Sequence, residues 1–159
     1  MMKLYAIIRI RGYAGTPWYI QDHLEKLRLK RRFNAMIYPE DNGILGRVRT
    51  VQSYVTWGEL NYEGLKLLLT RLYTINGIRV ERDLDLLKSK LKLENFESFV
   101  NAIFEGKLLL HKLDDYFKLP IRLHPPRGGF KGKINRPYGQ KGEFGYRGEK
   151  INELIRRMV

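Results

Sequence analysis

The sequence contains no cysteine among its 159 residues. Disulfide bonds, Cys-ligated zinc, iron–sulfur clusters and thiol catalysis are therefore excluded. Long hydrophobic runs are also missing, because apolar stretches such as 65–69 are interrupted by charge and fall far short of the roughly 18 residues of a membrane span. At the N-terminus, Arg9 and Arg11 cut off a short apolar run, so we expect no export signal.

Acidic residues are scarce. The chain has 17 Asp and Glu against 30 Lys and Arg, a net charge of +13. Such an excess favours a polyanionic partner, with nucleic acid ahead of an anionic membrane, because the cations are mixed with Gly and Pro instead of lining an amphipathic helix. With 43% hydrophobic and 12% aromatic residues, the chain has the composition of one folded domain, or of a small core carrying an appendage.

The positive charge is unevenly distributed. Residues 1–60 have a net charge of +5, residues 61–116 of zero and residues 117–159 of +8. The middle segment therefore has the charge balance of ordinary packed protein, and both ends of the chain are expected to contact the partner.

The first sixty residues predict strand, helix, strand, helix, strand. In 3–11, alternate apolar residues predict a strand with one core face and one partly basic face. Pro17 opens a predicted helix that runs to about Lys30, and a second helix follows possible caps at Asp41 or Asn42. The second and third strands are expected at 33–38 and 53–57.

Residues 61–116 predict a helical extension docked on this core. Leucines at 65, 68, 69 and 72 form a helical stripe that is expected to end at Asn76–Gly77. Further helices are expected from Asp83 and from Asn95, each with one apolar stripe.

Residues 117–159 change composition sharply. Seven Gly lie between 128 and 148, beside Pro and regularly spaced Lys and Arg, so most of this tail is expected to be extended or disordered. Helical spacing returns in 149–159, which predicts a short helix that docks on the body.

The basic and aromatic residues of the two ends are the candidate RNA contacts. Charge neutralises phosphate, rings can stack on bases, and a segment without a core can become ordered on RNA. The alternatives are a flexible basic loop in the tail and a solvated helix end at 27–33. The candidates are Arg9, Arg11, Tyr13, Arg28, Lys30, Arg31, Arg32, His124, Arg127, Phe130, Lys131, Lys133, Arg136, Tyr138, Lys141, Tyr146 and Arg147.

Other kinds of chemistry find little support in the sequence. No His or acid spacing indicates a metal site, and the tail glycines match neither phosphate-loop nor dinucleotide patterns. Nuclease chemistry needs paired carboxylates or a His pair, which the basic ends lack. Trp18, Tyr19 and Trp57 are expected in the core or at its edge, whereas Tyr13 is expected at the surface.

Several long stretches of the sequence resemble a known family. They are RIRGYAGTP, LKRRFNAMIYPEDNGILGRV and YVTWGE in the first sixty residues, and FKLPIRLHPPRGGFKG and INRPYGQKGEFGYRG in the tail. Together they resemble the large-subunit ribosomal protein L thirty family in its long archaeal form, whose eukaryotic counterpart is called L seven. The resemblance covers essentially the whole chain, and the tail motif is far more specific than a short pattern.

The resemblance implies an α+β fold: a ferredoxin-like β-α-β-α-β module with a three-stranded antiparallel sheet, then a helical extension and an extended basic tail. It implies three segments, a core module (1–60), a docked helical extension (61–116) and a basic segment ending in a short helix (117–159). Eukaryotic members carry a long basic N-terminal extension, whereas here the first strand is expected almost at Met1, which favours the archaeal form.

The resemblance further implies a structural constituent of the large ribosomal subunit, in the cytoplasm, that binds large-subunit rRNA beside neighbouring ribosomal proteins. No catalysis, cofactor, metal, membrane or small-molecule substrate is expected. The module's basic positions match Arg11 and the run Lys30, Arg31 and Arg32, and the tail motif matches Arg127, Lys131, Arg136 and Arg147. A free-standing RNA-binding protein or RNA chaperone and an RNA-processing factor stay open as alternatives.

Overall fold

The computed structural model describes residues 3–159. Its first part has the predicted alternation: β1 (Leu4–Arg9), α1 (Trp18–Lys26), β2 (Asn34–Pro39), α2 (Asn42–Thr50) and β3 (Val55–Glu59). Strand β1 is central and pairs antiparallel with both β2 and β3. Asp41 caps α2, because its Oδ1 accepts a hydrogen bond from the Gly43 backbone N–H at 2.8 Å.

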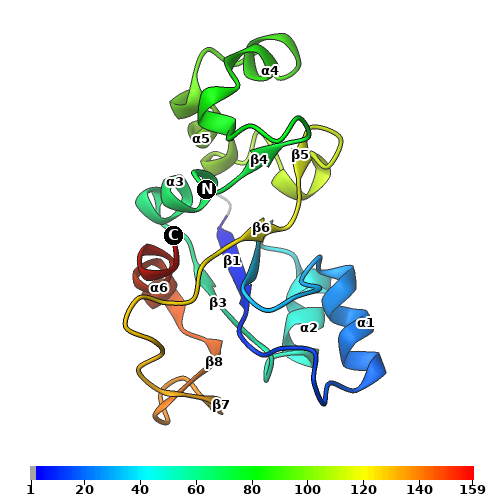
Figure 1. Cartoon of the computed structure of the whole chain (residues 1–159), viewed down its shortest axis with the longest axis vertical. Coiled ribbons are helices and arrows are strands. Elements are labelled where there is room, and N and C mark those ends of the chain that lie inside the picture. The colour runs from blue at the N-terminus through cyan, green and yellow to red at the C-terminus, as the bar shows by residue number, and fades with distance from the viewer. Residues whose placement is uncertain (1–2) are drawn as a thin grey trace.

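The helical extension forms the upper part of the molecule in Figure 1. It contains α3 (Tyr62–Leu69), β4 (Tyr73–Thr74), a 3₁₀ turn η1 (Val80–Arg82), α4 (Leu84–Ser89), α5 (Phe96–Phe104), η2 (Leu110–Lys112) and β5 (Phe117–Lys118). The predicted starts are confirmed, since side chains of Asn61, Asp83 and Asn95 cap α3, α4 and α5. The first helix ends at Leu69, earlier than the predicted Asn76, and β4 pairs with β5 beyond it.

The tail contributes strands to the main sheet. It forms β6 (Ile121–Arg122), β7 (Lys133–Pro137), β8 (Gly142–Tyr146), η3 (Gly148–Lys150) and α6 (Ile151–Met158). The sheet has six strands in the order β6-β2-β1-β3-β8-β7, and β8 runs parallel to β3. The predicted α+β class is confirmed, but the predicted three-stranded antiparallel sheet is wrong. Strands β7 and β8 lack apolar alternation, and β6 has two residues, so periodicity could not reveal them.

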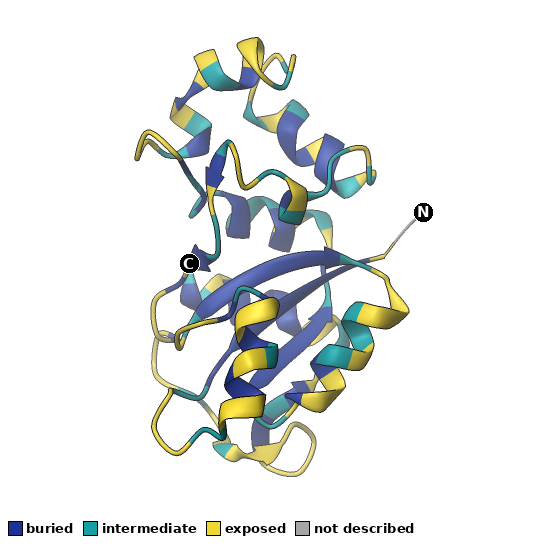
Figure 2. Ribbon diagram, turned by 90° about the vertical axis from the view of Figure 1, so that its right-hand side faces the viewer, coloured by how far each residue is buried: buried dark blue, intermediate teal, exposed yellow. Residues whose placement is uncertain are grey.

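Both faces of the central strands are buried (Figure 2). Tyr5 and Ile7 of β1 belong to a core beneath α1 and α2, whereas Ala6 and Ile8 point into a larger core shared with α3, α5 and α6. The prediction of a partly basic strand face is therefore wrong, because α1 and α2 cover the face that carries Tyr5, Ile7 and Arg9, and Arg9 is buried there.

Helix α6 covers the sheet face opposite α1 and α2, as its predicted apolar stripe requires. Ile151, Leu154, Ile155 and Met158 are all buried. Asn152 ties the helix to the module: its Nδ2 donates to the Glu59 carbonyl at 3.0 Å, and its Oδ1 accepts from the Asn61 N–H at 3.1 Å. The basic tail is therefore anchored at β8 and α6, which fixes its place beside the module.

Candidate RNA interface

The basic run between α1 and β2 forms a turn, which we call the basic turn (Arg28–Arg32). Helix α1 ends at Lys26, not at the predicted Lys30, and the backbone of Arg28 is left-handed with φ of 63°. Lys30, Arg31 and Arg32 are exposed, while Arg28 is half-buried and pairs with Asp114 at 3.1 Å. The turn therefore presents three cations to solvent instead of ending a helix.

Arg9 does not reach the surface. It is fully buried, and its Nη1 donates to the carbonyls of Leu29 at 2.9 Å and Lys30 at 2.7 Å. Its Nε donates to the backbone carbonyl of Arg11 at 2.8 Å. Burial lowers the pKa of this guanidinium from its ordinary value. Arg9 therefore shapes the basic turn from beneath, and its predicted role as an RNA contact is replaced by a structural one.

Arg11 and Arg32 lie at the end of β1 beside this turn. The Arg11 guanidinium stacks on the Tyr54 ring, 4.7 Å from its centroid. Arg32 stacks on Phe33 at 4.6 Å and donates from Nε to the Ile10 carbonyl at 3.0 Å. Stacking on Tyr54 orients the Arg11 guanidinium, and stacking together with a hydrogen bond orients that of Arg32. An oriented guanidinium recognises a phosphate better than a mobile one does.

Aromatic and main-chain contacts join the tail to the basic turn. Phe130 stacks on Phe33 with ring centroids 6.3 Å apart, so one of its faces is occupied by protein. The Leu123 N–H donates to the Phe33 carbonyl at 3.1 Å. His124 is exposed, and its Nε2 lies 3.0 Å from Nη1 of Arg71. The two predicted basic regions, far apart in sequence, thus lie side by side.

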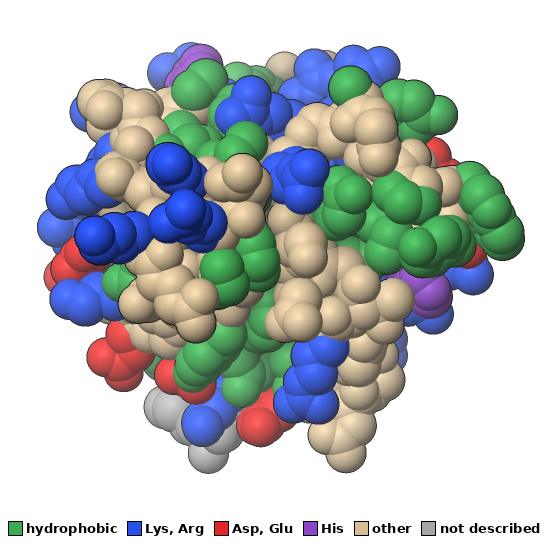
Figure 3. All heavy atoms as spheres, turned by 90° about the horizontal axis from the view of Figure 1, so that it is seen from below, with side chains coloured by type: hydrophobic (Ala, Val, Ile, Leu, Met, Phe, Trp, Pro, Cys, Tyr) green, Lys and Arg blue, Asp and Glu red, His purple; other side chains and the backbone are tan. Residues whose placement is uncertain are grey.

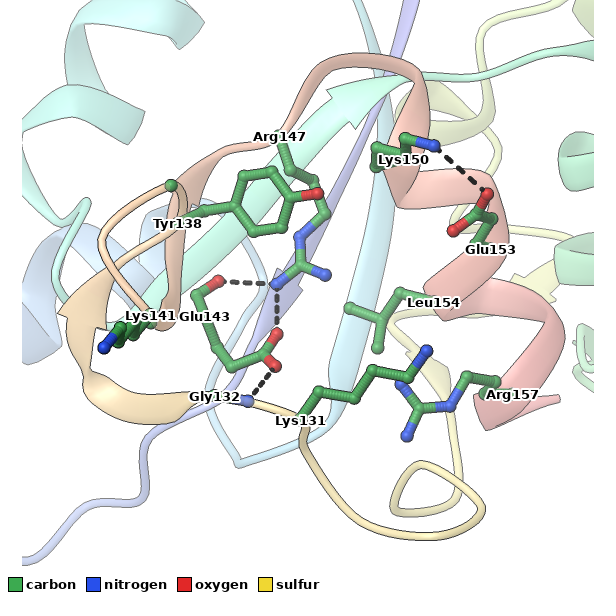
Figure 4. A pocket seen from close by; sticks show the side chains of 12 residues that line it. Lys131, Gly132, Tyr138, Lys141, Glu143, Arg147, Lys150, Glu153, Leu154 and Arg157 are labelled. Carbon is green, nitrogen blue, oxygen red and sulfur yellow. Dashed lines mark hydrogen bonds and ion pairs between the residues drawn. The ribbon is translucent and has the colours of Figure 1, made fainter.

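A groove of about 470 Å³ lies between the tail strands and α6, and we call it the tail groove. Figure 4 shows Lys131 beside Arg157 near the end of α6, and Lys150 directly before the start of α6. Arg157 donates to the carbonyls of Arg127 and Gly129, so α6 also holds the loop that leads into the groove. A concave surface lined by cations suits a phosphate backbone.

Arg147 lies in the wall of the tail groove but is buried. Its Nη2 pairs with Oε2 of Glu143 at 2.7 Å, and its Nε donates to Thr56 Oγ1 at 2.7 Å. Glu143 also accepts from the Gly132 N–H at 2.8 Å (Figure 4). Both side chains of the ion pair are 6% exposed, and the hydrogen bond to Thr56 fastens the tail to β3, so Arg147 supports the groove from within.

Two tail tyrosines stay partly exposed. The Tyr138 ring covers the Arg147 guanidinium, 4.7 Å from its centroid, and is 40% exposed. Tyr146 is 49% exposed, and its hydroxyl donates to Oε1 of Glu59 at 2.7 Å. That hydrogen bond to a carboxylate, together with burial, raises the pKa of Tyr146 to about 12. Both rings therefore remain partly accessible, and the Tyr146 hydroxyl stays protonated at ordinary pH.

The cations of this end are largely free of acids (Figure 3). Within residues 3–159, the nine ion pairs below 4.0 Å use none of the following: Arg11, Lys30, Arg31, Arg32, Arg127, Lys131, Lys133, Arg136, Lys141 and Arg157. Lys133, Arg136 and Lys141 are exposed on β7 and the turn after it. Uncompensated charge gathered at one end favours a polyanion there.

A second cationic recess, of about 300 Å³, was not predicted. Lys26, Arg28 and Arg47 line it together with Tyr38 and His111. Burial, followed by the charges of Lys112 and Arg28, lowers the pKa of His111 from its ordinary value. No local pattern links these residues, because α1, α2 and η2 bring them together only in the fold.

The expectation for the large aromatic residues holds only in part. Trp57 is 7% exposed and packs in the core as predicted. Trp18 and Tyr19 are 81% and 51% exposed, so their predicted core position is wrong; Tyr13, at 71%, is exposed as predicted. The helical period could have shown this, because α1 buries Ile20 and Leu24, and Trp18 and Tyr19 lie roughly 200° and 100° away from Ile20.

Searches of the described residues for two other kinds of site found none. Across residues 3–159, no group of three His, Cys, Asp or Glu side chains is arranged to hold a metal ion. None of the helices in that same part of the chain is both long and apolar enough to cross a membrane.

The fold and the charge distribution define a small, strongly basic α+β protein with unpaired cations at one end. The family model described as Ribosomal protein L30p/L7e matches residues 5–55. The chain is 66% identical to Large ribosomal subunit protein uL30 of Sulfurisphaera tokodaii, and 61% and 57% identical to the proteins of that name from Sulfolobus acidocaldarius and Saccharolobus solfataricus, with full coverage of each chain. The chain belongs to the ribosomal protein L30p/L7e family.

Proposed function

We propose that this protein is a structural constituent of the large ribosomal subunit in the cytoplasm, and that it is not an enzyme. Full-length identity of 57–66% to proteins named Large ribosomal subunit protein uL30 carries this conclusion. Its partners are large-subunit rRNA and neighbouring ribosomal proteins. The β1–β3 unit corresponds to the ferredoxin-like module expected from the resemblance.

RNA is held through the basic turn and the tail groove. The supporting observation is that, among the described residues, most cations of both regions have no carboxylate partner, the exceptions being Arg28, Arg147 and Lys150. Stacking in addition fixes Arg11 and Arg32. The contact set is Arg11, Tyr13, Arg28, Lys30, Arg31, Arg32, His124, Arg127, Phe130, Lys131, Lys133, Arg136, Tyr138, Lys141 and Tyr146, while Arg9 and Arg147 support it from within.

The three segments divide this work. Residues 1–60 form the RNA-binding module, residues 61–116 the docked extension, and residues 117–159 the second RNA-binding part. The zero net charge of the middle segment supports its role in packing against protein instead of RNA.

Sedimentation with charge-matched variants tests the proposal. One variant carries Lys131→Gln, Lys133→Gln and Lys141→Gln in the tail; its control carries Lys88→Gln, Lys90→Gln and Lys92→Gln, three exposed lysines on or just after α4. Each tagged protein is expressed in the host, and its share in the large-subunit peak is measured after a high-salt wash. We expect the wild type and the control in that peak and the tail variant depleted from it.

Two results would contradict the proposal in different ways. Wild-type protein only at the top of the gradient would exclude a ribosomal role and leave a free RNA-binding protein or a processing factor. Equal depletion of both variants would show that net charge, and not this interface, governs assembly.

A further inference from the structure

Three exposed rings lie at the start of α1 and in the turn directly before it, and we call them the aromatic platform (Tyr13, Trp18 and Tyr19). They are 71%, 81% and 51% exposed. A tryptophan ring left almost wholly in water loses the favourable free energy of burial. Neighbouring exposed rings therefore indicate a surface that a partner covers.

The platform rests on fixed backbone. The Thr16 N–H donates to the Tyr13 carbonyl at 3.0 Å, and Thr16 Oγ1 donates to the Gly12 carbonyl at 3.0 Å, so Tyr13 lies in a closed turn directly before α1. Trp18 and Tyr19 meet edge to face, with centroids 6.0 Å apart and planes at 89°. This contact occupies one face of one ring, and the high exposure of both rings leaves the other faces open to a flat partner.

The surrounding charge identifies the kind of partner. Arg11 lies two residues from Tyr13 in the same loop and has no carboxylate partner, and the first turn of α1 holds no acid. The nearest acid along the helix, Asp22, is already paired with Lys26 at 3.0 Å. Rings beside uncompensated cations suit a ligand with both flat bases and phosphates better than an apolar protein face.

We propose that the aromatic platform stacks on unpaired bases of the bound RNA, next to phosphates neutralised by Arg11 and the basic turn. The inference rests on the proposed rRNA binding and adds to it a site that reads unpaired nucleotides. Stacking is tolerant of base identity, because every base has a π-face, so the platform recognises that a base is unpaired and not which base it is.

The two tryptophans allow a direct test. In Trp18→Phe the remaining tryptophan is the buried Trp57, so the difference between wild type and this variant reports on Trp18 alone. The probes are a single-stranded oligoadenylate and the same strand annealed to its complement, at low salt. We expect the single strand to quench wild-type fluorescence, the duplex to quench much less, and the Trp18→Phe protein to respond to neither.

Affinity for protein-free large-subunit rRNA supplies a second readout. Trp18→Ala should weaken binding roughly 5- to 100-fold, the range for one stacked base, and Trp18→Phe much less because a ring remains. Neither change removes a charge, so the slope of log affinity against log salt should stay constant. Thermal unfolding checks that both variants are folded, as expected for a side chain 81% exposed.

The failures are distinguishable. Wild-type protein that binds no RNA overturns the proposed function, and the platform inference with it. RNA binding with unchanged Trp18 fluorescence and equal affinity of Trp18→Ala overturns the inference alone, and leaves a neighbouring protein as the group that covers the rings.

Discussion

Arg9 and Arg147 are cations that the fold uses for itself. Each is buried, with its guanidinium directed at carbonyl oxygens, and Arg147 also at a carboxylate. Neither could be told from its exposed neighbours by residue type or by local charge. Arg9 follows the alternation of β1 on the same face as Tyr5 and Ile7, and it is internal because α1 and the basic turn after it pack over that face. Positive charge in the sequence therefore locates a basic surface more reliably than it names the residues exposed on it.

The pair of Arg147 and Glu143 gives a prediction at this scale. Arg147→Met leaves the Glu143 carboxylate buried without its partner, which should cost about 3–5 kcal/mol in the free energy of unfolding. Adding Glu143→Gln should recover much of the loss. Denaturant unfolding of both single variants and the double variant measures the coupling.

Lys150→Met is the matched control for this pair. It removes an exposed ion pair with Glu153, 3.5 Å long, and should change stability by less than about 0.5 kcal/mol. Equal effects of Arg147→Met and Lys150→Met would show that the buried pair does not hold the tail in place.

Individual elements of the fold differ in how well local sequence defines them. Helix starts were predictable because a cap acts within one turn: Asp41, Asn61, Asp83 and Asn95 all cap the helices expected after them. The ends of helices were less predictable, because the leucine stripe of α3 continues past the residue at which the helix ends.

The tail strands were not predictable from periodicity. Strand β8 owes its place to a parallel pairing with β3 and to the hydrogen bond from Thr56 Oγ1 to the Gly145 carbonyl, 89 positions away in the sequence. Gly, Pro and Lys in β7 and β8 are typical of loops, and only the partner strand makes them sheet. The basic tail was recognisable as a binding segment by composition, but not as part of the sheet.

Gly58 gives a prediction at the scale of elements. A Cβ there would overlap the Gly148 carbonyl oxygen and come within 3.0 Å of the Ile151 Cβ, where α6 begins on β3. Gly58→Ala should therefore push α6 from the sheet and lower the free energy of unfolding by about 1–3 kcal/mol or more. Thermal unfolding measures the loss.

Gly46→Ala provides the comparison. Nothing lies within 4 Å of a Cβ at this exposed position inside α2, so the helix propensity of alanine should raise stability by about 0.5–1 kcal/mol. A Gly58→Ala protein as stable as the wild type would mean that the contact between β3 and α6 is loose.

The whole molecule separates its charge from its packing. The extension, neutral overall, lies at one end in Figure 1, and the tail strands β7 and β8 lie at the other. The apolar core runs continuously from the sheet into α3 and α5, so the two ends are one packed unit. This polarity leaves one face that is basic and one whose charge is balanced.

Salt dependence tests this polarity. If six to eight cations neutralise phosphates, the slope of log affinity for rRNA against log salt should be about −5 to −7. The triple variant at Lys131, Lys133 and Lys141 should reduce its magnitude by up to about three, and the triple variant at Lys88, Lys90 and Lys92 should leave it unchanged. A shallow wild-type slope would contradict a phosphate clamp.

The anchor of α6 has a consequence for biosynthesis. Asn61 and Asn152 meet across 91 positions of chain, so β1, β2 and β3 leave the translating ribosome well before the helix that covers their second face. During that interval Ala6, Ile8 and Ala35 have no cover from α6, and the nascent chain exposes an apolar sheet face that invites chaperones or premature association. Docking of α6 thus completes the fold and ends the exposure of this apolar face to premature association.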